Sequence, residues 1–500
     1  MTSGRRLFAL TFLLALLFCT TSIAQTGDAA ARGRAAARAM EEGRFDEAAN
    51  TYRDLLKAMP DEPGLLMNLG MALAMGGHEA EALAPLQRAL ALNPGLLPAR
   101  LFLGSSYLAL GQPEKAIAPL QRVVAARPAE VEHRRMLAQA YAASGRRTDA
   151  VTELRSITEL APKLPGGWYA LGHAYNAVAQ DAIGTFNNQP EELAWRQLLV
   201  ADALAADGRL TDAFAIYRET LERLPSMVSV HDSVARIYEQ TGHADWAARE
   251  RSGATLSAAD CARRRPLCEF RAGRYRTALV AALARTDAES RYWRARAATE
   301  LALAAFKRLD LLPDSRERRE VRATMARADR RYTDAIAELE AALRFAPGDP
   351  ALVDDLGTTY YFARDFERAV ATLSPLVKAN PNDARLLTVC GDSLLQLQRL
   401  QEALPMLERA VQRDPSDPMS RRALGRAYIQ KEDYNAAIPL IEAELADDQD
   451  GSLHVQLARA YTGLGQRDRA AALLAQSQEI QRTAQERSAA AGQRMITPPK

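Results

Sequence analysis

The sequence has few aromatic residues, few cysteines and histidines, and almost no net charge. Aromatic residues make up 6% of the 500 positions, and the chain holds 4 cysteines and 6 histidines. The 64 basic and 62 acidic residues leave a formal charge of +2, so no overall field attracts nucleic acid or an anionic membrane. The hydrophobic share of 48% is rich in Ala and Leu, which favours packed helices over a sheet.

No hydrophobic run after residue 25 is long enough to cross a membrane, so we expect no transmembrane segment in the mature chain. The apolar run from Leu7 to Phe18 follows Arg5 and Arg6 and precedes a small-residue pattern that ends at Ala24. We therefore expect a signal peptide that is cleaved near Ala24, and export to the periplasm or out of the cell. The arginine pair also resembles a twin-arginine signal, which leaves that route open beside the general secretory one.

Residue spacings typical of metal or catalytic sites are also missing. No two histidines stand at the spacing of an HExxH motif, and the chain has no GxSxG motif and no phosphate-binding loop. Cys390 lies in a predicted helix core without a recognisable histidine partner, which indicates a small buried thiol. We therefore expect no metal, no cofactor and no enzymatic activity.

The chain does contain a repeat. The stretch from Leu97 to Glu130 holds one helix, a tight turn and a second helix, and its pattern recurs along the chain. Prolines at the ends of such helix pairs stand 34 residues apart, at Pro60, Pro94, Pro128 and Pro162. The repeat predicts one elongated array of helix pairs instead of several globular domains.

The small and apolar positions of the repeat resemble those of the tetratricopeptide repeat (TPR) family. In the stretch 97–130 they are Leu103, Gly104, Tyr107, Gly111, Ala116, Leu120, Val123 and Pro128. The small residues let the two helices of a pair approach closely, and the larger ones fill the space between them. The resemblance implies an all-α, right-handed superhelical solenoid of antiparallel helix pairs that holds protein partners.

Two departures from the 34-residue repeat predict elongated helices near 166–188 and 291–311, each of which ends before a proline, Pro190 or Pro313. The expected organisation is a signal peptide at 1–24, an N-terminal array of about four repeats at 25–164, a long-helix insertion with two repeats at 165–258, an irregular cysteine-containing repeat with the second long helix and another repeat at 259–349, a C-terminal array of about four repeats at 350–485, and a flexible tail at 486–500.

Cys261 and Cys268 lie in the least regular stretch of the array, 257–276. On one straight helix their separation would place them roughly 10 Å apart, too far for a bond. Pro266 suits the first turn of a helix, which puts Cys261 in the preceding loop and Cys268 inside the helix. A disulfide is then feasible and is expected in an exported protein. The spacing does not fit a CxxC metal site.

The TPR resemblance implies that the first helix of each pair lines a concave inner face. In the N-terminal half its inner positions are mostly apolar and rich in methionine, which favours an extended peptide or an amphipathic helix as the bound partner. The alternative is that neighbouring repeats or the long helix after Trp168 cover this face. The candidate groove residues are Met67, Asn68, Met71, Met75, Leu101, Phe102, Ser105, Leu108, Met136, Gln139, Tyr169, His173 and Asn176.

Charged residues take the inner positions in the C-terminal half. They are Asp354, Asp355, Asp392, Arg422, Arg426 and Arg459. We expect them to pair with one another, and a second, polar binding site is the alternative. A separate arginine group consists of Arg263, Arg264, Arg265, Arg271, Arg274 and Arg276. We interpret it as a solvated surface, with weak contact to anionic envelope components as the alternative.

These patterns together predict a non-catalytic protein–protein interaction scaffold in the bacterial cell envelope. It would bind extended or helical peptide segments of a partner that the sequence does not identify. One alternative is a coupling subunit of an envelope export or polysaccharide assembly machine. A second alternative is an envelope enzyme whose site has no recognised motif.

Overall fold

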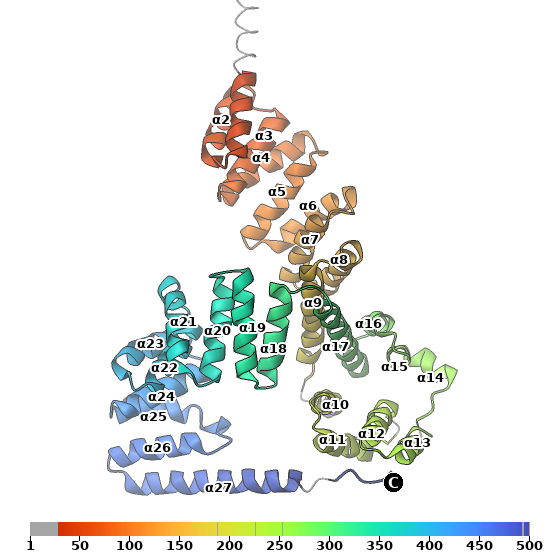
Figure 1. The fold of residues 1–500 in the computed structure, drawn as a ribbon, viewed down its shortest axis with the longest axis vertical. Helices are drawn as coiled ribbons and strands as arrows, with labels where there is room; N and C mark the ends of the chain where they lie inside the picture. The colour runs from red at the N-terminus through yellow and green to blue at the C-terminus, as the bar shows by residue number, and fades with distance from the viewer. Residues whose placement is uncertain (1–28, 188, 226, 253, 493–494, 500) are drawn as a thin grey trace, which may run out of the picture. The chain divides into compact units, whose positions relative to one another are not determined.

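The computed structural model describes residues 29–187, 189–225, 227–252, 254–492 and 495–499. These residues form helices joined by short connections, and no strand occurs among them. The expected signal peptide lies outside the described residues. The chain forms two compact units, which divide after Val178 inside the helix α9 (Figure 1).

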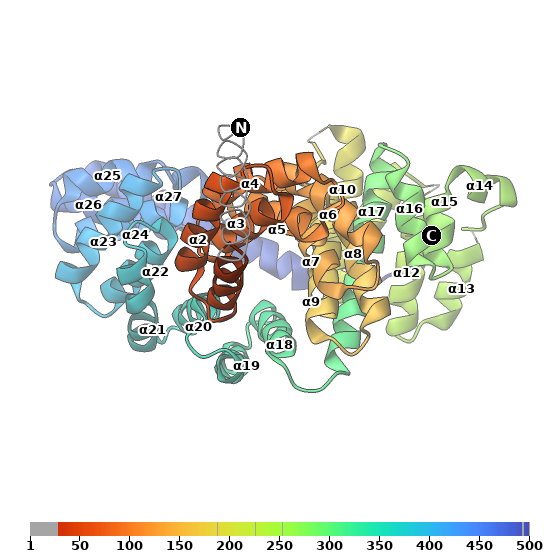
Figure 2. The ribbon, with the colours of Figure 1, turned by 90° about the horizontal axis from the view of Figure 1, so that it is seen from above.

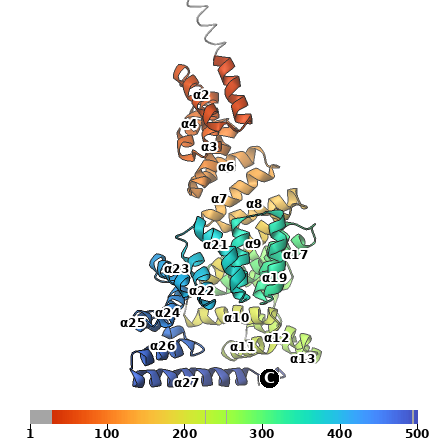
Figure 3. The same cartoon turned by 60° about the vertical axis from the view of Figure 1, so that its left-hand side comes forward.

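The first unit is a series of antiparallel helix pairs in which each helix packs on the next (Figures 1 and 3). It begins with a helix over 29–41. The helices that follow are α2 (Phe45–Ala58), α3 (Pro63–Met75), α4 (Glu79–Leu92), α5 (Leu97–Ala109), α6 (Pro113–Ala126), α7 (Val131–Ala143), α8 (Arg147–Leu160) and α9 (Pro165–Gly184).

The helices of a pair meet at a glycine, as the repeat predicts. A Cβ added to Gly104 on α5 would lie 2.6 Å from Cγ of Leu120 on α6, and Leu120 is completely buried. The turn between these helices is at Gly111, whose φ of +67° is a conformation that costs glycine little. The same turn recurs without glycine in the second unit, where Arg364 has a φ of +63°.

The second unit continues the pattern with more varied helix lengths (Figure 2). Its helices after α9 are α10 (Pro190–Ala206), α11 (Leu210–Arg223), α12 (Val228–Gln240), α13 (Ala244–Ser252), α14 (Ala258–Arg263), α15 (Arg265–Arg271), α16 (Tyr275–Leu283), α17 (Ala288–Asp310), α18 (Arg316–Ala328), α19 (Tyr332–Phe345), α20 (Pro350–Phe362), α21 (Phe366–Ala379), α22 (Ala384–Gln396), α23 (Leu400–Arg413), α24 (Pro418–Gln430), α25 (Tyr434–Glu442), α26 (Ser452–Gly463) and α27 (Arg467–Gly492). A single 3₁₀ turn, Leu445–Asp447, lies between α25 and α26.

The predicted fold class, an all-α solenoid of helix pairs with two elongated helices, is confirmed. The elongated helices are α9 with 20 residues and α17 with 23. Helix α27 is longer still, with 26 residues. The boundary at 486 that the sequence suggested between the last repeat and the tail falls inside this helix. One local expectation is wrong: Cys261 lies in the short helix α14 and not in a loop, since Ser257 and Asp260 form a capping box that starts a helix there.

Candidate partner-binding surface

Five of the candidate groove residues form an apolar surface on three first helices of the first unit. Leu101, Phe102 and Leu108 on α5 are half-buried and contact the core of the unit. Met67 on α3 and Met136 on α7 have the same partial burial. Helix α5 packs against both α3 and α7, so the structure brings these side chains onto neighbouring helices. We call these five residues the apolar surface.

Seven of the other eight candidate groove residues are more polar or more exposed, and Met71 is a half-buried methionine outside the apolar surface. Met75, Gln139, His173 and Asn176 are exposed, whereas Asn68, Met71, Ser105 and Tyr169 are half-buried. The rings of Tyr169 and His173 lie 4.3 Å apart between centroids, one turn apart on α9. None of the thirteen candidate residues is fully buried, so each keeps some accessible surface for a partner.

The second unit contains a buried polar network that the sequence patterns did not indicate. The Asp202 carboxylate on α10 accepts hydrogen bonds from the hydroxyls of Tyr217 (2.6 Å) and Tyr292 (2.7 Å) and forms an ion pair with Arg296. Burial, and next the Asp202 charge, raise the pKa of both tyrosines well above the usual range. Both phenols therefore stay protonated and act as donors. The network joins α10, α11 and α17.

A polar cavity of about 240 Å³ lies beside this network. Its lining residues are Ser229, Asp232, Ser233, Arg236, Arg251, Phe270, Arg271, Tyr275, Tyr292, Trp293 and Arg296. Three of its four guanidinium groups have carboxylate partners. Arg271 pairs with Asp232 at 2.9 Å, and Arg251 and Arg296 form ion pairs with Glu239 and Asp202. Most of the positive charge of the cavity is therefore neutralised within the chain.

Five of the six charged inner positions of the C-terminal half have ion-pair partners among the described residues, but only Asp392 and Arg426 pair with each other as expected. Asp392 is nearly buried, lies 2.6 Å from Arg426, and accepts a 2.7 Å hydrogen bond from the hydroxyl of Tyr361. Asp354 and Asp355 form ion pairs with Arg385 and Arg327. Arg422 lies 3.4 Å from Glu444. Several partners are thus residues other than those that the repeat positions suggested.

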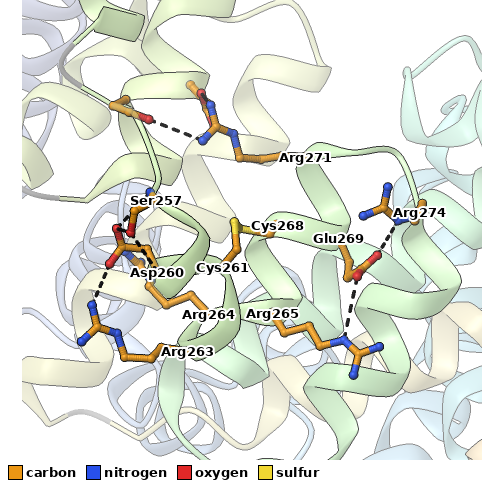
Figure 4. Close-up of a disulfide and its surroundings, with 12 residues drawn as sticks. Ser257, Asp260, Cys261, Arg263, Arg264, Arg265, Cys268, Glu269, Arg271 and Arg274 are labelled. Carbon is orange, nitrogen blue, oxygen red and sulfur yellow. Dashed lines mark hydrogen bonds and ion pairs between the residues drawn. A yellow bond between two sulfur atoms is a disulfide. The ribbon is translucent and has the colours of Figure 1, made fainter.

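The arginine group around the cysteines is also mostly paired (Figure 4). Arg263 pairs with Asp260 at 2.8 Å, and Arg274 with Glu269 at 2.6 Å. Glu289 and Asp232 are the partners of Arg264 and Arg271, and Glu269 lies 3.8 Å from Arg265. Only Arg276 has no ion pair among the described residues. Four carboxylates thus face six arginines, and Arg265 and Arg274 share Glu269.

Cys261 and Cys268 form a disulfide between α14 and α15 (Figure 4). Their Cα atoms lie 5.6 Å apart, because the helical conformation is interrupted at Arg264 between the two short helices. Pro266 occupies the first turn of α15, as the sequence predicts. The remaining cysteine in the described part of the chain, Cys390, is a buried free thiol.

Among the residues that the structure describes, no helix combines the length and the hydrophobicity that crossing a membrane requires. In the same residues, no group of three or more His, Cys, Asp or Glu side chains is arranged to hold a metal ion.

Several solved structures of MamA proteins are similar in part. MamA from Desulfovibrio magneticus RS-1 is 24% identical over a match that spans 29% of this chain and 82% of the MamA chain, with a TM-score of 0.28. MamA MSR-1 is 20% identical over a match that spans 34% of this chain and 98% of the MamA chain, with a TM-score of 0.30. Such low scores assign no function to this chain, and no curated protein matches it.

The family profile described as tetratricopeptide repeat matches four stretches of the chain. They are residues 27–96, 103–165, 355–418 and 388–452, which include Met67, Leu108 and Met136 of the apolar surface and most of the paired charges of α20 to α24. These stretches have the close glycine contacts and the regular helix pairs described above. This protein is therefore a member of the tetratricopeptide repeat family.

Proposed function

We propose that this protein is a non-catalytic scaffold that binds an extended or helical peptide segment of a protein partner on the apolar surface. Five half-buried apolar side chains on α3, α5 and α7 support this proposal, because a partner that covers their exposed parts gains binding free energy from the burial of apolar area. Full burial of one Leu or Phe side chain stabilises by about 1.5–3 kcal/mol. Methionines at both ends of the surface adapt to partners of different shape.

We place the scaffold in the cell envelope after export. The apolar run and the small-residue pattern at 1–24 and the Cys261–Cys268 disulfide support this location, because disulfides persist in oxidising compartments. A coupling subunit of an export or polysaccharide assembly machine is the second candidate. It differs from a free scaffold in one observable, namely stable co-purification with membrane proteins.

The test compares a triple serine variant of the apolar surface with a double serine control. Each is used for affinity purification from the envelope fraction, and its partners are identified by mass spectrometry. Leu101, Phe102 and Leu108, which are half-buried, are changed to Ser together. The control changes Leu92 and Leu160, which are exposed and lie at the ends of second helices, to Ser. We expect the first variant to lose its main partner and the control to retain it, both with unchanged helicity by circular dichroism. Retention of the partner by both variants would overturn the proposed surface.

A further inference from the structure

Residues 495–499, which follow α27, lie against α12 in the second unit. The hydroxyl of Tyr238 on α12 donates a 2.7 Å hydrogen bond to the carbonyl of Thr497, although the two residues are 259 positions apart. Ile496 is half-buried against the core formed by α10 to α13. Pro499 is also half-buried, whereas Thr497 and Pro498 between them are exposed. Two inward residues three positions apart match the three-residue turn of a polyproline II helix.

The tyrosine that holds this segment occupies a repeat position with a regular partner elsewhere. In five other repeats the tyrosine at this position bonds to a residue 19 or 20 positions before it. The pairs are Tyr107 with Gln87, Tyr141 with Gln121, Tyr360 with Glu340, Tyr428 with Glu408, and Tyr461 with Glu442. The two glutamines donate from Nε2 to the phenol oxygen, whereas the three glutamates accept the phenol proton.

The repeat of α12 departs from this rule. The residue 20 positions before Tyr238 is Arg218, which has donors only and cannot accept the phenol proton, and Glu219, 19 positions before Tyr238, forms an ion pair with Arg223 instead. Tyr238 is completely buried, so an unsatisfied hydroxyl there would cost about 1–3 kcal/mol. The Thr497 carbonyl supplies the missing acceptor. The repeat therefore leaves a donor at this position for a main-chain carbonyl from outside the repeat.

The surroundings of Tyr238 suit a proline-containing segment. The rings of Phe214 and Trp246 flank it at 5.7 and 5.6 Å between centroids, and Trp246 stands edge-on at 83°. Burial raises the pKa of Tyr238 to about 12, so its hydroxyl is a donor at neutral pH. Aromatic walls around a hydrogen-bond donor are the usual means by which proteins bind polyproline II segments.

Pro499 lines a cavity of about 490 Å³ that extends this surface. Leu221 and Pro225 contribute apolar walls, and Arg218, Glu222 and Arg249 contribute charges. The volume lies within the range of about 300–1,000 Å³ that is typical of binding pockets. Space thus remains beside Pro499 for the further residues of a longer peptide.

We propose that α11, α12 and α13 form a second peptide-binding site, and that residues 495–499 occupy it as an intramolecular ligand. The site takes an extended segment with a β-branched apolar residue, a carbonyl for Tyr238 at the next position, and prolines after it. A protein partner with such a segment binds only when residues 495–499 leave. This inference does not depend on the apolar surface of the first unit.

The test uses a fluorescein-labelled peptide, Met-Ile-Thr-Pro-Pro-Lys, and two forms of the protein, the full chain and a chain that ends at Gly492. Linked segments have effective concentrations of the order of 1 mM. A peptide with a Kd of about 0.1 mM for the shortened chain should therefore bind the full chain about tenfold more weakly in fluorescence anisotropy. Equal binding to both forms, or no binding to a shortened chain with normal circular dichroism, would overturn the proposal.

Point variants separate recognition from general loss of structure. Tyr238→Phe in the shortened chain should weaken peptide binding by about two- to tenfold, the effect of one hydrogen bond. Tyr107→Phe, which removes the corresponding hydroxyl in the first unit, should leave it unchanged. If the shortened chain does not fold, Ile496→Asp in the full chain takes its place, because it weakens the internal ligand and should increase peptide binding. No increase in that variant also counts against the site.

Discussion

Substitution of Gly104 by alanine tests the close helix contact on which each repeat depends. The new Cβ would lie 2.6 and 2.7 Å from Cγ and Cδ2 of Leu120, well inside van der Waals contact. Leu120 is completely buried between α5 and α6 and cannot move aside freely. Overpacking of this kind costs about 1–3 kcal/mol, and a contact this short belongs near the upper end.

The same substitution has a favourable effect that must be subtracted. Alanine stabilises a helix interior by about 1 kcal/mol relative to glycine. The net expectation for Gly104→Ala is thus a loss of about 1–2 kcal/mol in the free energy of unfolding. Gly33 is a matched control, because it lies inside the helix over 29–41 with nothing within 4 Å of an added Cβ. Gly33→Ala should stabilise by up to about 1 kcal/mol.

A double-mutant cycle with Leu120→Ala isolates the contact. In the Leu120→Ala background the overlap is gone, so Gly104→Ala should become stabilising by about 1 kcal/mol. The coupling between the two substitutions is then about 2–3 kcal/mol. Urea unfolding followed by circular dichroism measures all four chains. If Gly104→Ala has the same destabilising effect in both backgrounds, the contact with Leu120 is not its cause and the reasoning is refuted.

Three further predictions concern interactions in the second unit. The Glu250 carboxylate lies 2.6 Å from His231 and raises the pKa of His231. The pair therefore stabilises the fold fully below the pKa of about 6.5 that His has in the unfolded chain. This stabilisation is lost as the pH rises through the higher pKa of the folded protein. His231→Gln should therefore destabilise more at pH about 5.5 than at pH about 9, and an equal loss at both would contradict this. Replacement of Cys261 and Cys268 by serine should lower the free energy of unfolding by roughly 2–3 kcal/mol, while alkylation of the denatured chain without reductant should leave both cysteines unmodified; modified thiols would show that the bond is absent in solution. Asp392→Asn keeps the shape but removes the charge that faces Arg426, and we expect a loss of about 1–3 kcal/mol in thermal unfolding, because the guanidinium is only partly exposed; an unchanged melting temperature would refute this role.

The repeat architecture could be predicted because its determinants are local. Each helix pair contacts mainly its neighbours, so a 34-residue pattern in the sequence specifies the fold unit by unit. Gly104 and Tyr107 identify the pair, and the interruption of the repeat before Pro190 and Pro313 identifies the long helices. The turn residues were only partly predictable, since Arg364 adopts the left-handed conformation that glycine takes at Gly111.

The candidate sites depend on the sequence to different degrees. The apolar surface follows from repeat positions, and the structure places its residues on neighbouring helices with partial exposure, but its role in binding stays a prediction. The pairing of charges in the C-terminal half was expected in kind, whereas partners such as Arg385 for Asp354 were not, because long side chains reach beyond the repeat position that carries them.

The sequence by itself determined the repeat family and the helix pairs, because these recur with a period along the chain, and the two elongated helices, because they interrupt that period. Only the tertiary structure decided which distant residues meet. Asp202 joins Arg296 in the buried network, and Thr497 satisfies Tyr238 in place of the partner that Arg218 cannot provide. The first two residues are 94 positions apart in the chain and the second two are 259 positions apart. Each contact is made by one pair of residues and does not recur from repeat to repeat, so no periodic pattern in the sequence reveals it.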